Sequence, residues 1–387
     1  MKRQSVTSVP RSESLSLVSA QVALWQRLGE VSDPRKARGR RFPLSVLLVI
    51  ALCATAAGFG SWRAMAQWAA AAEPQEKLRL GLVPVGAFEL VRAPGADTLR
   101  RVLSAVRPGE LEVLLRVREV ALETVAADGK ALRGSRRGTE SAVMLIGAMA
   151  QDGTLVAQQR VADKSNEIPA LTPLLSVLDL RGVVVTADAL HTQAETAKVL
   201  VEEMGAHFVL TVKRNQPTLW ETCRSIPWHE VTAVHKESGR GHGRLETRVT
   251  KVVTWGDLAF PYVRQVARVV RHRTVEASGK RTREIVYLIT DLTSQRAAPE
   301  VVARYARGHW GVENKIHYVR DVTFGEDAAR IRTGHGPQNV STLRSITINF
   351  LRWTGSSIAD AQRRLALAPH KAPLDLFGVP ADQQLSS

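Results

Sequence analysis

The sequence contains little cysteine and few aromatic residues. Only Cys53 and Cys223 occur among 387 residues, and their wide separation excludes a disulfide framework and a cysteine-based metal cluster. A reducing compartment is therefore expected. Hydrophobic residues make up 44% of the chain and charged residues 23%, a composition that excludes a disordered or low-complexity protein. At about 100–200 residues per domain, two or three domains are expected.

Only one long hydrophobic run is present. Residues 42–60 carry no charge and follow a basic stretch, as a signal peptide or membrane anchor would. The run starts after 41 residues, however, and its dense part, residues 46–53, is far shorter than the roughly 20 residues that cross a bilayer. We expect a buried helix and no membrane association, with a membrane-anchored enzyme as the alternative.

Acidic side chains are scarce relative to basic ones, 37 against 53, so the formal net charge is +16. The excess is concentrated in two segments. Residues 1–45 hold nine basic and three acidic side chains, and residues 205–290 hold fifteen and seven. This distribution favours a nucleic-acid partner that is gripped at more than one place. An arginine-rich chain with solvated charged faces is the alternative.

The hydrophobic pattern changes near residue 120. Apolar residues recur at helical spacing over 42–72 and 97–123, so residues 1–120 are expected to form an all-helical domain. Beyond it, short apolar runs and turn signals predict a three-strand meander followed by alternating helices and strands. This order is typical of an α/β sheet of mixed strand direction.

The second domain is expected to span residues 121–352. Within it, residues 214–284 are rich in β-strand signals and interrupt the alternation of helices and strands, so we interpret them as an insertion between two elements of one sheet. The last segment, residues 353–387, is rich in alanine, proline and serine and is expected to be a peripheral tail.

Two aspartates follow predicted strands. Asp128 lies in a glycine-containing segment next to four cationic side chains, although an ordinary Asp-Gly turn also explains it. Asp188 follows the β-branched run 183–186, and ligand clefts in α/β sheets lie at the carboxyl ends of such strands. The alternative role for Asp188 is to cap the helix that begins near Thr192.

A third acid, Glu313, lies on a long helix expected from Pro299 to Arg320. His317 and Arg320 follow at four and seven residues, so the three side chains share one helix face. This face either lines a cleft or is an ordinary solvated surface. Three carboxylates brought together by the fold could hold a pair of divalent ions for phosphodiester chemistry. Zinc-ligand patterns, a phosphate-binding glycine loop and a GxSxG elbow are absent from the sequence.

Five motifs occur in one order along the chain. They are DGKALRGS (128–135), KSNEIPAL (164–171), TADALHTQ (186–193), VKRNQPTL (212–219) and RGHWGVENKIHYVRDVTFGEDAARIR (307–332). Over residues 25–352 the chain resembles the H-repeat-associated branch of the DDE insertion-sequence transposases. Residues 33–58 and Trp68 also resemble the N-terminal domain associated with that branch.

The resemblance implies an RNase H-like catalytic core. In it, Asp128, Asp188 and Glu313 would be the catalytic acids and would hold two Mg²⁺ or Mn²⁺ ions. The implied activity is cleavage and strand transfer of DNA. The implied partners are terminal inverted repeats and target DNA, bound by a homodimer in the bacterial cytoplasm, at the nucleoid. A catalytically inactive DNA-binding relative is the alternative.

The resemblance also implies weaker roles near the DNA for the remaining motif positions. These are Lys130, Arg133, Lys213, Asn215, Gln216, Arg307, Asn314, His317 and Arg320. The wider family places a tyrosine, an arginine and a later basic residue around the third acid, which Tyr305, Arg307 and Arg320 approximate with a different spacing. Glu326 is the next candidate for the third acid. Ser165 or Asn166 is expected to cap a helix that has Pro169 in its first turn, and Trp310 is expected to pack in the core or stack on a base.

Overall fold

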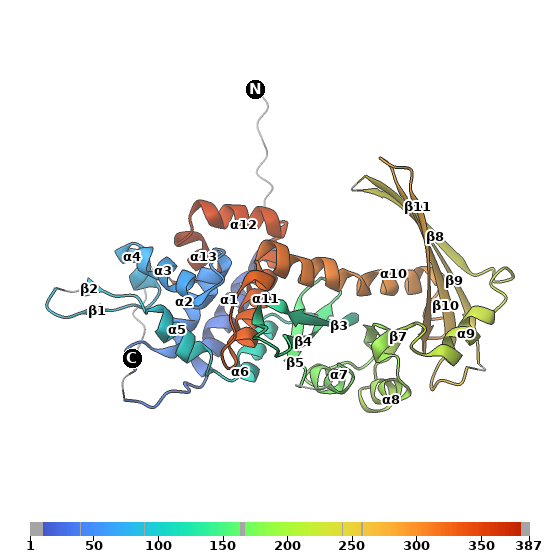
Figure 1. The fold of residues 1–387 in the computed structure, drawn as a ribbon, viewed down its shortest axis with the longest axis horizontal. Helices are drawn as coiled ribbons and strands as arrows, with labels where there is room; N and C mark the ends of the chain where they lie inside the picture. Colours follow the sequence, from blue (N-terminus) through green and yellow to red (C-terminus); the bar gives the residue numbers. More distant parts are fainter. Residues whose placement is uncertain are drawn as a thin grey trace, which may run out of the picture.

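A helical part and a mixed β-sheet lie side by side in this computed structural model (Figure 1). The structure describes residues 11–380 except Gly39, Glu89, 163–166, His242 and Asp257, and for residues 11–16 it describes the backbone alone. The expected capping residues Ser165 and Asn166 therefore lie outside the described residues. The mixed α/β class agrees with the expectation of an RNase H-like core.

The N-terminal part consists mainly of helices. They are α1 (Arg11–Glu30), α2 (Leu44–Ala56), α3 (Trp62–Ala71), α4 (Pro74–Arg79), α5 (Ala96–Leu103) and α6 (Pro108–Glu112). The helical stretch expected over 42–72 is two helices, because Gly58 turns the chain with φ +90° and Ser61 caps the start of α3. The stretch expected over 97–123 also breaks, with Pro108 starting a new helix.

The expectation of an all-helical first domain is wrong at one place. A short hairpin, β1 (Pro84–Val85) and β2 (Leu90–Val91), follows α4. The hydrophobic run forms α2, in which every residue except Ser45 is buried. Within the part of the chain that the structure describes, no helix combines the length and the hydrophobicity needed to cross a bilayer.

The sheet has nine strands in the order β5-β4-β3-β6-β7-β11-β10-β9-β8. Its first five members are β3 (Thr124–Leu132), β4 (Val143–Ala150), β5 (Leu155–Arg160), β6 (Val184–Ala187) and β7 (His207–Val212). Strands β3, β6 and β7 are parallel neighbours, whereas β4 and β5 pair antiparallel as the expected meander. The connections carry α7 (Ile168–Leu175) and α8 (Ala194–Lys198).

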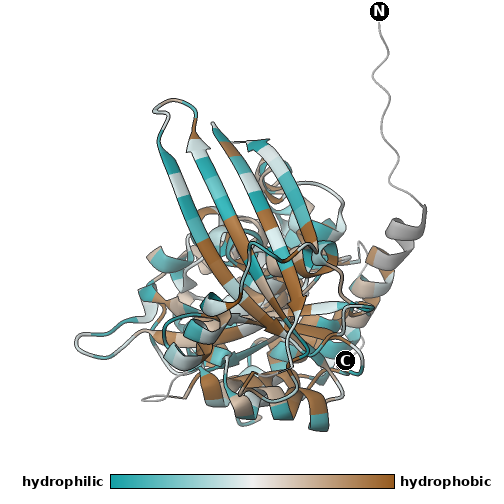
Figure 2. Cartoon of the chain, turned by 90° about the vertical axis from the view of Figure 1, so that its right-hand side faces the viewer, coloured by the Kyte–Doolittle hydropathy of each residue, from teal (hydrophilic) through white to brown (hydrophobic). Residues whose placement is uncertain are grey.

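The β-rich insertion extends this sheet. After α9 (Pro217–Ser225) come β8 (Val234–Gly241), β9 (Arg244–Thr254), β10 (Gln265–Val275) and β11 (Arg281–Thr290). Strand β11 starts inside the expected insertion and pairs with β7, so the insertion and the core share one continuous ladder. Figure 2 shows these strands as a fan whose far ends are hydrophilic, in accordance with the exposed first half of β11.

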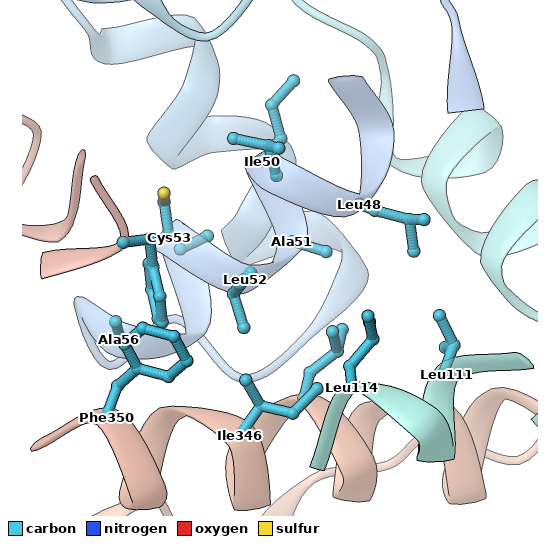
Figure 3. Close-up of a cluster of buried hydrophobic side chains, with 14 of the residues drawn as sticks. Leu48, Ile50, Ala51, Leu52, Cys53, Ala56, Leu111, Leu114, Ile346 and Phe350 are labelled. Atoms are coloured by element: carbon cyan, nitrogen blue, oxygen red, sulfur yellow. The ribbon is translucent and has the colours of Figure 1, made fainter. Parts of the chain in front are cut away.

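The C-terminal part returns to the helical side. It begins with α10 (Pro299–His309), continues through π-helical turns Glu313–His317 and Val319–Thr323, and ends with α11 (Gly336–Trp353), α12 (Ile358–Leu367) and α13 (Lys371–Leu376). All residues of α11 except Arg352 are buried. Figure 3 shows side chains of α2 facing Ile346 and Phe350 of α11, so both ends of the chain build one core.

The expectation of a peripheral C-terminal tail is wrong. Leu374 and Phe377 are buried in the same core as α2, and the ring of Phe377 lies 5.1 Å from that of Phe350. The indole nitrogen of Trp68 donates a 2.9 Å hydrogen bond to the carbonyl of Pro369. The segment is short and rich in small residues, but its few large apolar side chains fill space between α2, α3 and α11.

Candidate active site

The two aspartates lie at one place in the sheet. Strands β3 and β6 are parallel, and their ladder ends with Ala127 opposite Ala187, so Asp128 and Asp188 occupy the next position on each strand. Asp128 is interior to β3, which continues to Leu132, and is not at the strand end as its glycine neighbour suggested. Asp188 follows the last residue of β6, as expected.

The third acid approaches Asp128 from the helix. Glu313 Oε2 lies 3.1 Å from Nδ1 of His317, and the same nitrogen lies 3.7 Å from Oδ2 of Asp128. Asp128, Glu313 and His317 each offer a ligand atom within 4.8 Å of the other two. The Glu313 side chain is 71% exposed, whereas that of His317 is buried. The structure thus brings two of the three expected acids, and the expected histidine, into contact distance.

The electrostatics around Asp128 are unfavourable for a bare carboxylate. Burial raises the pKa of Asp128, and the nearby carboxylates of Asp188, Glu167 and Glu313 raise it further, to about 6, against a hydrogen bond from the amide of Gly129. A divalent cation would relieve this excess of negative charge. Burial and the guanidinium of Arg320 lower the pKa of His317, which favours its neutral ring.

The donor set fits a hard divalent cation. Carboxylate oxygens are the protein ligands that Mg²⁺ and Mn²⁺ prefer, and a neutral imidazole orients a neighbouring ligand through its ring N–H. Asp128 and Glu313 could hold such an ion, and Asp188 lies on the neighbouring strand. His317, bonded to Glu313, would fix the orientation of that carboxylate.

The loop after Asp188 is held by Asn215 and Gln216, two residues that were expected to lie near the DNA. Asp188 caps the short turn Ala189–His191 by accepting a 3.0 Å hydrogen bond from the amide of Leu190. Asn215 donates to the carbonyl of Ala189 at 2.7 Å, and Gln216 donates to the carbonyl of Thr192 at 2.9 Å. Asp188 therefore acts as a cap, but of this 3₁₀ turn and not of the helix expected to begin near Thr192.

Asn215 and Gln216 thus position this loop through their side-chain amides. Lys213, which precedes them, is exposed. Asn314 is exposed beside Glu313, and its side chain lies 3.4 Å from the carbonyl of Trp310. His309, which is not among the expected site residues, lies beside β6 with Nδ1 3.3 Å from the hydroxyl of Thr186, and burial lowers its pKa to about 4.

Two cationic side chains that were expected near the DNA form ion pairs within the protein. The ammonium group of Lys130 lies 2.6 Å from Asp321, and its side chain is only 9% exposed. Arg320 is buried and donates to Glu326 at 2.7 Å and to Gln158 at 3.1 Å. Both cations are thus already paired with carboxylates of the protein, and their contact with DNA stays a prediction. Arg133 remains 81% exposed.

Glu326, the alternative third acid, is also excluded from the site. Its carboxylate is buried between Arg320 and Arg344. Burial opposes its ionisation, but the two guanidinium groups outweigh burial and lower its pKa. Glu326 is therefore a charged core residue. The spacing of Arg320 along its helix could not show whether this arginine faces solvent or, as here, pairs with a buried carboxylate.

One acidic residue near Asp128 was missed by sequence reasoning. Glu167 precedes α7, and its carboxylate carbon lies only 2.1 Å from the position that a Cβ atom on Gly129 would take. His191 is buried, and its Nε2 lies 3.7 Å from Oε2 of Glu167. Glu167 lies in the KSNEIPAL motif, in which the residues around it are helix-start signals. This motif was the signal in the sequence that could have identified Glu167.

A second charged site lies where α10 meets the inserted strands. Arg307 donates to Glu237 of β8 at 2.9 Å. Around this pair is a cavity of about 350 Å³, here named the arginine pocket. The cationic residues of the arginine pocket are Arg240, Arg244, Arg248, Arg271, Arg273 and Arg307, and its acidic residues are Glu237 and Glu246.

The indole of Trp310 supports the arginine pocket. The guanidinium carbons of Arg248 and Arg271 lie 5.5 and 5.8 Å from its ring centroid, which are cation–π distances. Trp310 also lines a small apolar pocket against β7, β10 and β11. It therefore packs within the protein, one of the two roles that the sequence left open.

Residues 25–117 match the family described as DDE_Tnp_1-associated, and residues 121–350, more than half of the chain, match the transposase DDE domain. "H repeat-associated putative transposase YhhI" and "Putative protein YbfL", both of Escherichia coli (strain K12), are similar to the chain at 29% and 30% identity, over 85% of this chain and 90% of each relative. Among solved structures, a piggyBac transposase synaptic complex with hairpin DNA has a TM-score of 0.44 at 10% identity, covering 96% of this chain and 82% of that one.

Proposed function

This chain belongs to the DDE transposase family, and on that premise we propose that it binds the ends of an insertion sequence and catalyses metal-dependent DNA cleavage and strand transfer. The observation that carries the proposal is the approach of Glu313 and His317 to Asp128, whose pKa is raised, while Asp188 follows the end of the neighbouring parallel strand. Such a site favours a divalent cation and a phosphodiester substrate.

Asp128, Asp188 and Glu313 would hold the ions, which would supply activation of a water or a 3′-hydroxyl and stabilisation of the leaving oxygen. His317 orients Glu313 through the 3.1 Å contact, and Asn215 and Gln216 hold the loop that carries Asp188. The exposed side chains of Lys213 and Arg133 lie near the site and contact phosphates of the DNA that enters it.

Most of the affinity for DNA comes from outside the acidic site. The arginine pocket gathers six guanidinium groups against two carboxylates on exposed strands and on α10. Residues 1–45 carry the other basic excess. Two separated basic segments suit a protein that holds a terminal inverted repeat and target DNA, working as a homodimer at the bacterial nucleoid.

The test is cleavage of a duplex that carries the inverted repeat read from the DNA flanking the gene. With Mg²⁺ or Mn²⁺, Asp128→Asn, Asp188→Asn and Glu313→Gln should each lower the cleavage rate by on the order of 10³-fold or more, while a gel shift without metal shows retained binding. Asp97→Asn and Glu300→Gln, at exposed helix positions, are the matched controls.

Near-normal cutting by Glu313→Gln would overturn its assignment as third ligand. Wild-type protein that binds the ends but never cuts them would establish the inactive DNA-binding relative instead.

A further inference from the structure

Glu167 and Gly129 form a close contact that ordinary packing does not require. Both carboxylate oxygens of Glu167 lie within 2.2 Å of the position that a Cβ atom on residue 129 would occupy. A side chain at residue 129 would displace this carboxylate from its position. Strand β3 runs past the end of β6 at this point, so the Glu167 carboxylate lies against the strand segment that carries Asp128.

The Glu167 carboxylate lies close to other acidic side chains. It stands against Gly129, the residue after Asp128, and Asp128 is grouped with Glu313. The Glu167 side chain is 18% exposed. A partly buried carboxylate next to three others is destabilising unless a cation compensates it.

A buried imidazole points to the same place. The side chain of His191 is 1% exposed, and its two ring nitrogens have no hydrogen-bond partner among the described residues. Its Nε2 lies 3.7 Å from Oε2 of Glu167, slightly beyond hydrogen-bond distance. His191 belongs to the turn that Asp188 caps, so this unsatisfied ring connects Glu167 with the Asp188 loop. Buried polar groups of this kind in native proteins usually bind an ordered water or an ion, or have a functional role.

We propose that Glu167 is a fourth carboxylate of the metal centre, that Gly129 is required to admit it, and that His191 orients it by a hydrogen bond when the ion is bound. This inference rests on the proposed function and deepens it. Glu167 would contact a divalent ion beside Asp128 and Glu313, from the position against Gly129 that its carboxylate occupies.

The first measurement is Mn²⁺ binding to the full-length protein without DNA. The electron paramagnetic resonance signal of the free ion reports how much Mn²⁺ stays unbound. Glu167→Gln should weaken Mn²⁺ binding by on the order of 10–100-fold, the range for residues that tune a metal site. Glu195→Gln, an exposed glutamate on α8, is the matched control and should bind as wild type does.

The second measurement is thermal unfolding without metal. Removing the charge of Glu167 relieves repulsion on Asp128, so Glu167→Gln should be at least as stable as wild type without metal and should gain less stability from Mn²⁺. A structural role alone would instead lower the metal-free stability and leave Mn²⁺ binding unchanged, which would overturn the inference.

Gly129→Ala provides an independent test through non-additivity. Alone, it should weaken Mn²⁺ binding because the methyl group displaces the Glu167 carboxylate. Combined with Glu167→Ala, it should add almost nothing, since the colliding group is gone. Additive losses would show that residue 129 acts on the metal without Glu167 and would contradict the proposed contact.

Failure of this inference can be separated from failure of the proposed function. If Asp128→Asn abolishes Mn²⁺ binding and Glu167→Gln does not weaken it, Glu167 is not a ligand and the three-acid site stands. If Asp128→Asn also leaves Mn²⁺ binding unchanged, the metal centre itself is wrong, and the inference falls with it.

Discussion

Arg320 and Glu326 form a buried ion pair, with Nε of the arginine 2.7 Å from Oε2 of the glutamate. Arg344 reaches the other carboxylate oxygen at 3.3 Å, and Arg320 also donates to Gln158 on β5 and to Ser341 on α11. This network joins the helical segment that carries Glu313 and His317 to both the sheet and the helical core. The position of the third acid therefore depends on ion pairs that lie behind the site.

Removing the shared carboxylate should destabilise the fold. Glu326→Ala leaves two buried guanidinium groups without their partner, and the expected loss is about 3–5 kcal/mol in the free energy of unfolding. Urea unfolding measures it. Asp360→Ala, which removes the carboxylate of an exposed pair on α12, should change little. A Glu326→Ala protein as stable as wild type would contradict the role given to this network.

The same pair should make stability sensitive to acid. The pKa of Glu326 is lowered in the folded protein, so its contribution is complete above the ordinary glutamate pKa of about 4.3 and is lost as the pH falls below it. The stability difference between wild type and Glu326→Gln should therefore shrink between pH 5 and the acid limit of folding. A difference that stays constant over this range would show that the carboxylate is not preferentially ionised in the fold.

Metal binding should follow the titration of Asp128. Its pKa is raised to about 6 from an ordinary value near 3.9, so the metal-free protein should lose stability as the pH rises through this interval. Binding of a cation requires the deprotonated carboxylate, so stabilisation by Mn²⁺ should be small at pH 5 and large at pH 7.5. Thermal unfolding at both pH values measures this, and Asp128→Asn should lose both effects. Equal stabilisation by Mn²⁺ at the two pH values would contradict it.

The C-terminal helices should be part of the folding unit. Phe377→Ala removes a buried ring from the core that α2 and α11 share, and the expected cost is about 3–5 kcal/mol. Leu367→Ala is the control, because this leucine is 87% exposed and should change stability by less than about 0.5 kcal/mol. A similar small effect for both variants would restore the description of this segment as peripheral.

The arginine pocket should contribute to the salt dependence of DNA binding. Replacing Arg240 and Arg244 by alanine should weaken binding and reduce the slope of log K against log salt by up to about 1.8, since each phosphate contact contributes about 0.9. Arg363→Ala with Arg364→Ala makes the same charge change on α12, far from the inserted strands (Figure 1), and should leave the slope unchanged. An equal loss of slope in both double variants would assign the effect to net charge alone.

Much of the candidate site could be predicted from the sequence because its residues lie within contiguous motifs. The β-branched run before Asp188 formed a strand, and the motif around Glu313 formed a helix, as local periodicity and propensity indicated. The resemblance to the DDE transposases, carried by those motifs, is confirmed by the family match over residues 121–350. The catalytic roles of Asp128, Asp188 and Glu313 stay predictions.

The sequence by itself determined the family, the mixed α/β class and the buried nature of the hydrophobic run, because these depend on composition and short-range pattern. Tertiary structure decided which polar groups face one another. It buried Arg320 against Glu326, paired Lys130 with Asp321, and placed Glu167 on Gly129 across 38 residues of chain. Burial and ion pairing depend on contacts between distant segments, and no local periodicity distinguishes an arginine that faces solvent from one that holds a core carboxylate.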